Sequence, residues 1–246
     1  MTIDVIVFAP HPDDETLACG GVIAKRQAQG KQVLVVFMTD GSQCHQAVLG
    51  LNNPSPTQLT IMRQLEAQQA VAALGLPPGR CVFLGQPDTE LKSTPIVQAS
   101  VEAVLQNHPE VNEVYFPHEF KELNADHVNT GVLVNAALSA LRFNPVCYRY
   151  VVWNQKTEGE FGYQNAIEIE YKILNEIRVE EDISEFLPRK NCAMQCHRSQ
   201  LELVSADQRR PVVPKTWLAE ILAQPREVFW MSKEADHHVE EVPIKV

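Results

Sequence analysis

The residues best suited to chemistry gather in the stretch PHPDDE. It holds one imidazole, His11, and three consecutive acids, Asp13, Asp14 and Glu15, directly after the apolar run DVIVFAP. An acid at a helix start often serves only as a cap, where the helix dipole stabilises it by roughly 0.3 to 1 kcal/mol. Glu15 is the best candidate for such a capping or supporting role. Three adjacent acids are more than a helix cap needs, so the stretch predicts a functional site.

A second polar group follows a later apolar run. His118 ends EVYFPH, and NADH, residues 124 to 127, begins the next expected helix. In open α/β sheets ligands bind at the carboxyl ends of the strands, so both groups are expected to face one crevice. Imidazole and carboxylate together suit zinc, and a catalytic zinc takes three protein ligands and keeps one position for water. His11, Asp14 and His127 would complete that set.

The neighbouring Asp13 is then free for another task. Zinc lowers the pKa of bound water from about 15.7 to about 7, and a carboxylate held nearby can accept the proton as hydroxide attacks. The pattern therefore predicts metal-assisted hydrolysis with Asp13 as general base. His127 alone is an ordinary helical histidine, and only its pairing with the first motif makes it a ligand candidate.

These groups need strands and helices to position them. Short apolar runs bounded by Pro or Gly predict buried strands, and segments with near-helical apolar spacing separate them. The expected strands are DVIVFAP, KQVLVVFM, RCVFLG and EVYFPH, with helices at about 15 to 30, 56 to 75, 94 to 109 and 126 to 141. This alternation predicts a doubly wound α/β sheet, mainly parallel, with helices on both faces.

The C-terminal third has a different spacing of apolar residues. YRYVVWNQ, AIEIEY and NEIRVEE alternate apolar and polar residues, which predicts antiparallel or edge strands. A late helix after Pro188 and a closing strand EVFWMSKE follow, and residues 43 to 57 are typical of a loop. No flexible linker marks a boundary near residue 148, so residues 1 to 246 are interpreted as a single domain.

Composition and charge exclude several function classes. The chain is 45% hydrophobic and 21% charged, as in soluble globular proteins, and its formal charge of -10 offers no basic footprint for nucleic acid or an anionic membrane. Its apolar runs fall short of the roughly 20 residues of a spanning helix. Six scattered cysteines and the absence of a secretory signal at the start predict a cytoplasmic protein. A small neutral or cationic ligand is favoured.

Two further patterns carry less weight. Cys192, Cys196 and His197 suggest a metal site, but a structural zinc usually takes four ligands in two paired clusters, so helical cysteines facing a core are favoured. The first turn lacks G-x-G-x-x-G, the chain has no G-x-x-x-x-G-K-[ST], and acids would repel phosphate there. Nucleotide binding is therefore disfavoured.

Several motifs together resemble a known family. PHPDDETLACGG, VVFMTDGS, RQLEAQQAVAALG, FLGQPDTEL and ADHVNTG are similar, in order and spacing over about residues 3 to 140, to the LmbE-like, or PIG-L, zinc N-deacetylases, and RKNCAMQCHRSQ resembles that family's late helix. The resemblance implies a Rossmann-like fold, one zinc per chain on His11, Asp14 and His127, and Asp13 as general base. It also implies hydrolysis of the acetyl group of an N-acetylated amino sugar or related small amide.

One position departs from the family pattern. The family usually has an oxyanion-stabilising histidine three residues before the metal histidine, and Asn124 stands there. Asparagine can donate a hydrogen bond, worth roughly 2.7 to 4 kcal/mol in an oxyanion hole, but no proton to a leaving amine. Asp13 could return its proton, and His118 and His197 are the other candidates for that role and for substrate contact. Asp126, which would orient the missing histidine, is expected to hold the loop or a neighbouring side chain.

Other polar residues have competing interpretations. Arg63 with Glu66 matches the family's helix signature, in which the arginine reaches the substrate, yet Arg and Glu three apart are also an ordinary surface ion pair. Asp40 is interpreted as a turn residue, Asp88 as a residue of a turn or of the pocket, and His45 as a residue of a solvated loop.

The alternative function is a catalytically impaired zinc- and sugar-binding or regulatory module, in which Asn124 reflects lost catalysis. The natural substrate, the homo-oligomeric state and the use of another divalent transition metal stay open.

Overall fold

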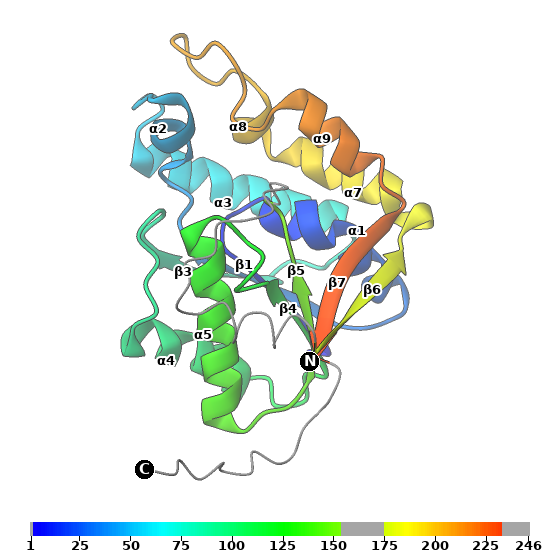
Figure 1. Ribbon diagram of the computed structural model, residues 1–246. Coiled ribbons are helices and arrows are strands. Elements are labelled where there is room, and N and C mark those ends of the chain that lie inside the picture. Colours follow the sequence, from blue (N-terminus) through cyan, green and yellow to red (C-terminus); the bar gives the residue numbers. More distant parts are fainter. Residues whose placement is uncertain (1, 154–174, 233–246) are drawn as a thin grey trace.

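The computed structural model describes residues 2–153 and 175–232. These form a seven-stranded sheet with the order β3-β2-β1-β4-β5-β7-β6 (Figure 1). The strands are β1 (Val5–Ala9), β2 (Val33–Thr39), β3 (Cys81–Gln86), β4 (Glu113–Pro117), β5 (Val146–Tyr150), β6 (Glu176–Asp182) and β7 (Arg226–Ser232). β1 to β5 pair in parallel with one another, and β7 is antiparallel to both β5 and β6. The predicted α/β sheet, mainly parallel with antiparallel additions, is confirmed.

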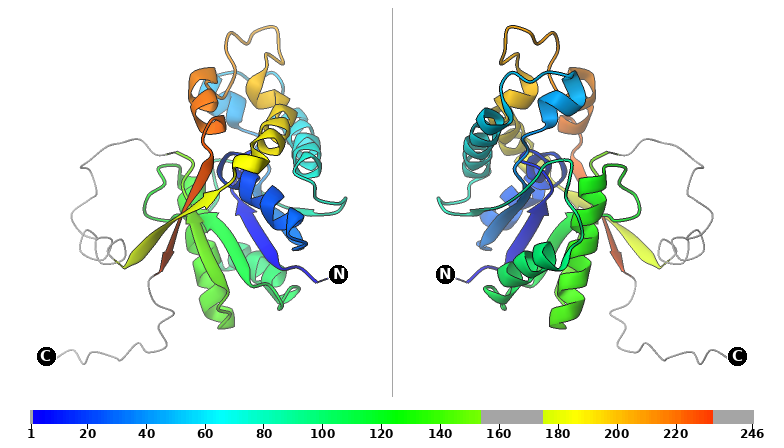
Figure 2. Two further views of the ribbon diagram at one scale, coloured as in Figure 1. Left: turned by 90° about the vertical axis from the view of Figure 1, so that its right-hand side faces the viewer. Right: turned by 90° about the vertical axis from the view of Figure 1, so that its left-hand side faces the viewer.

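Helices cover both faces of the sheet, as expected. They are α1 (Asp14–Ala28), α2 (Cys44–Leu49), α3 (Pro56–Ala73), α4 (Pro95–Gln106), α5 (Ala125–Leu141), the 3₁₀ turn η1 (Ser184–Phe186), α7 (Leu187–Cys196), α8 (Arg198–Leu201) and α9 (Lys215–Leu222). One core lies under α1, α3, α7 and α9, and the other lies under α4 and α5 (Figures 1 and 2). In β1, Val5 and Val7 enter the first core, and Ile6 and Phe8 enter the second. A strand buried on both faces reads as a continuous apolar run.

Local signals set where two of the helices begin. Ser55 accepts a hydrogen bond from the Gln58 backbone N–H, and the Gln58 side chain accepts one from the Ser55 N–H. This capping box precedes the proline that starts α3. Thr94 caps α4 in a similar way, again before a proline.

The structure corrects two expectations from the sequence. β5 pairs in parallel with β4 along its length and lies inside the sheet, although its alternating residues predicted an antiparallel or edge strand. A crossover through α5 forces the parallel direction. The alternation arises because Tyr148 and Tyr150 pack on the first core, while Arg149, on the other face, pairs with Glu119. Residues 44 to 49, expected as loop, form α2, which ends at Gly50 in the left-handed region. The expected strand AIEIEY lies outside the described residues.

Two glycines permit close approaches that orient the site-bearing helices. A side chain at Gly131 would lie 2.5 Å from the Pro117 carbonyl oxygen, so α5 can pack directly on the end of β4. A side chain at Gly21 would lie 2.5 Å from Ile183, which brings η1 against α1. Among the helices of the described ranges, none combines the length and the apolar character needed to cross a membrane.

Candidate active site

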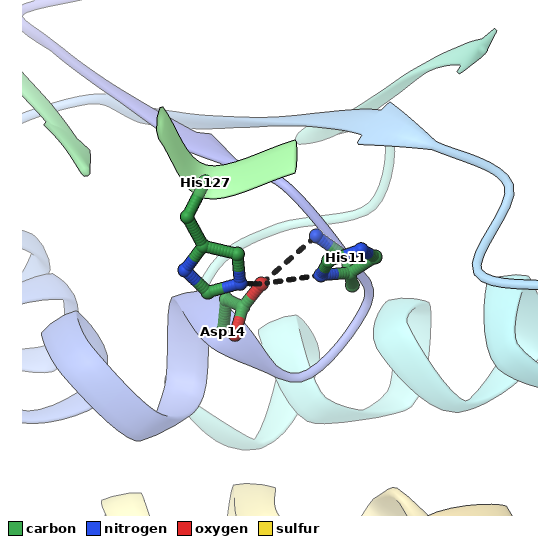
Figure 3. A group of neighbouring side chains, drawn as sticks. All are labelled: His11, Asp14 and His127. Carbon is green, nitrogen blue, oxygen red and sulfur yellow. Dashed lines mark hydrogen bonds and ion pairs between the residues drawn. The ribbon is translucent and has the colours of Figure 1, made fainter. Parts of the chain in front are cut away.

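The predicted ligands meet at the carboxyl ends of β1 and β4, where the strand order changes direction. His11 and Asp14 follow β1, and His127 lies in the first turn of α5. Asp14 stands between the two imidazoles, because its Oδ2 lies 3.1 Å from His11 Nδ1 and 3.1 Å from His127 Nε2 (Figure 3). The structure thus brings together side chains that are more than 100 residues apart in the sequence.

This group fits a zinc ion. His127 is fully buried, and neither ring nitrogen makes a hydrogen bond within the described residues, although Nε2 approaches Asp14 so closely. Buried polar atoms without hydrogen bonds are rare. Two atoms that each bind a tetrahedral zinc at about 2.0–2.2 Å stand roughly 3.4 Å apart, which is close to the separations found here.

Carboxylates stand behind both imidazoles. Glu122 Oε1 lies 3.1 Å from His127 Nδ1, while His11 Nε2 lies 3.1 Å from Asp126 Oδ2 and 3.2 Å from Asp88 Oδ1. Such acids fix the tautomer of a ligating histidine and raise its basicity. His11, Asp88 and Asp126 also form a second compact group of ligand atoms. Asp88 and Asp126 contact His11 Nε2, the nitrogen that faces away from Asp14, so we interpret them as acids that support the imidazole.

The sequence alone does not reveal the part played by Glu122. Its one signal is an acid in the connection before the metal histidine, which no spacing rule singles out. Asp126 does both things expected of it, since it contacts the first imidazole and holds the loop after β3. That loop donates to Asp126 from the Thr89 and Leu91 backbone N–H groups at 2.8 and 3.1 Å. Asp88 lines the cavity described below.

The charges of the group are strongly coupled. Burial raises the pKa of Asp14, but the His127 and His11 imidazoles outweigh burial and hold that pKa well below its usual range. Burial lowers the pKa of His127, yet Asp14 and Glu122 raise it to about 9. A cation that binds these groups must therefore displace protons from the imidazoles.

The side chain of Asp13 does not cap α1. It occupies the N-cap position of α1 with φ 144°, and its side chain makes no capping hydrogen bond. Its Oδ1 accepts a hydrogen bond of 3.1 Å from Arg63 Nη2. Burial raises the pKa of Asp13 to about 6, although Arg63 acts in the opposite direction. A carboxylate with a pKa near the working pH suits a general base. Glu15 has the supporting role expected of it, because it accepts the Asp13 backbone N–H at 2.9 Å.

Arg63 and Glu66 are buried and form no surface ion pair, so that interpretation is wrong. Arg63 donates to the Pro12 and Gly41 carbonyl oxygens at 2.6 and 2.9 Å. Glu66 accepts from the Ser199 N–H and hydroxyl at 2.7 and 2.6 Å. The reason is tertiary, since this side of α3 faces the loops after β1 and β2 and the start of α8.

A cavity of about 640 Å³ opens beside the ligands. Its lining includes these residues singled out from the sequence: His11, Asp13, Asp14, Arg63, Asp88 and Asn124. Much of the remaining wall is apolar, and there Trp153 and Trp217 stack with ring centres 4.5 Å apart. Asn124 Oδ1 accepts the Asp126 N–H at 2.8 Å and caps α5, which leaves the amide NH₂ group to donate.

Three other histidines of the described ranges, His45, His118 and His197, do not line this cavity. His118 and His197 are fully buried, with Nε2 2.9 Å from Glu176 and 3.0 Å from Glu15 respectively. The geometry gives no support to the predicted contact of either with substrate. His45, expected in a solvated loop, is also fully buried, because α2 brings its Nε2 to 3.1 Å from the Ser199 carbonyl oxygen.

The two neighbouring cysteines lie apart from the site. Cys192 is exposed, which contradicts the expected core-facing position, and Cys196 is partly buried. In the part of the chain that the structure describes, neither belongs to a compact group of ligand atoms.

Comparison with known proteins assigns the family. The model of the PIG-L family, described as GlcNAc-PI de-N-acetylase, matches residues 6–138, which is more than half of the chain. This chain belongs to the PIG-L family. The matched region contains both ligand-bearing segments, Asp13 and Arg63, and the predicted family is confirmed.

Relatives of this PIG-L chain extend over nearly its full length. A probable N-acetyl-alpha-D-glucosaminyl L-malate deacetylase 2 from Bacillus cereus is 27% identical over 237 residues, 93% of this chain and 97% of that protein. The N,N'-diacetylchitobiose deacetylase from Pyrococcus horikoshii has a TM-score of 0.64 at 21% identity, covering 94% of this chain and 84% of that one. GalB, the 4-carboxy-2-hydroxymuconate hydratase from Pseudomonas putida, has a TM-score of 0.60 at 20% identity, covering 80% and 78%. Proteins with different named activities therefore share this fold, and function must be argued from the site.

Proposed function

We propose that this PIG-L protein is a zinc-dependent hydrolase that removes an acetyl group from an N-acetylated amino sugar or related small amide. The observation that carries the proposal is the compact group of His11, Asp14 and His127, with Asp13 beside it on the wall of one cavity. The deacetylase names of a full-length relative and of a solved structure support the substrate class.

Each residue of the site has a defined task in this reaction. A zinc ion on the three ligands would supply a water molecule with a pKa of about 7 and polarise the acetamide carbonyl. Asp13 takes the proton of the attacking water, while Arg63 holds its Oδ1 in place. The Asn124 amide donates to the developing oxyanion. Asp13 then returns the proton to the leaving amine, because His118 and His197 lie outside the cavity lining.

The cavity wall is suited to a sugar ring. Trp153 and Trp217 contribute flat apolar surface to the lining, which also holds the polar groups of the site. Ligand sites commonly combine an apolar wall with a few well-placed polar groups.

Metal analysis combined with an acetate-release screen tests the function. Purified protein is stripped with a chelator, reloaded with zinc, and assayed on N-acetylglucosamine glycosides and acylated amines. We expect acetate release to rise with zinc, to stop with the chelator, and to return on reloading. Zinc-loaded protein that is inert on the whole panel would refute hydrolysis and favour the binding or regulatory module. Full activity after complete metal removal would refute the zinc requirement.

A further inference from the structure

Asp13 has a backbone conformation that few residues with a side chain adopt. Its φ of 144° is positive, and among the described residues only Thr89 and Arg142 are other non-glycines with positive φ. Strained backbones of this kind persist only where the surrounding structure over-determines them. Something near Asp13 must therefore hold it.

The Glu15 carboxylate is the group that does so. Its Oε2 accepts the Asp13 N–H at 2.9 Å, while the Asp13 carbonyl accepts the Thr16 and Leu17 N–H groups at 3.1 and 2.9 Å. Both ends of the strained residue are thus bound, one by a side chain and the other by the first turn of α1. Glu15 is fully buried, so water does not compete for its oxygens.

Glu15 is itself held by two donors. Thr16 Oγ1 donates to Oε1 at 2.6 Å, and His197 Nε2 lies 3.0 Å from the same oxygen. His197 is fully buried, and its Nδ1 has no hydrogen-bond partner in the described ranges. A proton on Nδ1 would therefore be buried without an acceptor, which favours the tautomer whose Nε2–H donates to Glu15.

His197 is tied to α3 through the residues that follow it. Two residues later Ser199 gives both its N–H and its hydroxyl to Glu66 on α3. One helical turn before Glu66, Arg63 binds the Asp13 side chain and the Pro12 carbonyl. α3 therefore supports Asp13 twice, directly through Arg63 and indirectly through His197 and Glu15.

We propose that Glu15 and His197 are positioning residues that hold the Asp13 backbone in its strained conformation and so aim its carboxylate into the cavity. Neither residue lines the cavity. The consequence for turnover rests on the proposed function, whereas the effect on the Asp13 backbone does not. The HRSQ segment, residues 197 to 200, would then support Asp13 even though His197 does not line the cavity.

The test compares four variants chosen for this chain of contacts. His197→Ala removes the donor, and His197→Gln restores an N–H group at similar reach. Thr16→Val removes the second donor with little change of shape. Tyr150→Phe is the control, because it also removes a buried donor to a carbonyl, that of Phe8, with little change of shape, and the Tyr150 hydroxyl bonds to neither Glu15 nor Asp13.

The first measurement is amide hydrogen exchange at Asp13 in the metal-free protein. We expect exchange roughly five- to tenfold faster in His197→Ala and Thr16→Val, and near the wild-type rate in His197→Gln and Tyr150→Phe. Unchanged exchange in His197→Ala, or an equal increase in Tyr150→Phe, would overturn the proposal. This readout stands even if no substrate is ever turned over.

The second measurement uses zinc-loaded protein of checked metal content. His197→Ala is expected to lower kcat by about 10–100-fold with little change in KM, and His197→Gln to recover most of the loss. In an Asp13→Asn background, the same substitution should have almost no further effect. Independent, multiplying losses would show a merely structural role. A wild-type protein that releases no acetate would refute the proposed function and leave the exchange result to decide the positioning.

Discussion

Replacing Asp13 by Asn isolates the proton-transfer step from the metal site. Asparagine has nearly the same shape, tolerates positive φ better than most residues, and still offers Oδ1 to the Arg63 guanidinium. The fold and the zinc ligands should therefore survive. What disappears is the group that takes the proton from water.

The size of the effect follows from the state of the carboxylate. With its pKa raised to about 6 by burial, Asp13 is mostly ionised at pH 7, so the wild type has its base in the working form. A positioned general base accelerates reactions about 10²–10⁴-fold, and we expect kcat to fall by that factor. Removing one partner of a buried ion pair usually lowers the free energy of unfolding by about 3–5 kcal/mol. Because Arg63 keeps its hydrogen bonds to two carbonyl oxygens, we expect a loss at the lower end of that range.

The assay measures acetate release at saturating substrate together with zinc per chain. Asp40→Asn serves as the matched control, because Asp40 accepts the Ser42 N–H in a turn and an asparagine can do the same. We expect the control to keep its kcat within a few-fold. If Asp13→Asn kept wild-type turnover at equal zinc content, Asp13 would not be the base. If it lost the zinc, its carboxylate would be a ligand instead.

Three further predictions concern the ligands, their supporting acids and the pH dependence of stability. His11→Ala and His127→Ala should each lower bound zinc, and full metal occupancy in both variants, measured by mass spectrometry, would defeat the ligand assignment. Glu122→Gln should weaken zinc binding about 10–100-fold in a chelator competition, because the charge behind His127 is lost, and an unchanged affinity would remove that supporting role. Burial raises the pKa of Glu113, but hydrogen bonds from Lys31 and Arg26 outweigh burial and lower it, so its ion pairs add stability above its ordinary pKa of 4.5 that is lost as pH falls. The difference in unfolding free energy between wild type and Glu113→Gln should then be largest near pH 7 and shrink below that pKa, and a difference that stays constant with pH would contradict the linkage.

Short patterns in the amino-acid sequence are enough to predict the strands, the family and the central chemistry. Apolar runs such as DVIVFAP and KQVLVVFM predict buried strands because the pattern of apolar residues within a short segment is enough to indicate its secondary structure and burial. The alternation with helices implies parallel pairing, and parallel pairing places the ends of β1 and β4 at one edge. His11, Asp14 and His127 can therefore be grouped from the sequence alone.

The task of each supporting side chain depends instead on tertiary packing. Glu15 and His197 are 182 residues apart in the chain and meet at 3.0 Å, and Glu66 reaches Ser199 across 133 residues. No local spacing encodes such contacts, because they depend on how α3, α7 and α8 pack against the loop after β1. Burial then changes which contacts a polar side chain must make. Arg63 can serve as an exposed ion-pair partner in water, but once buried it must satisfy its donors on nearby carbonyl oxygens and on Asp13.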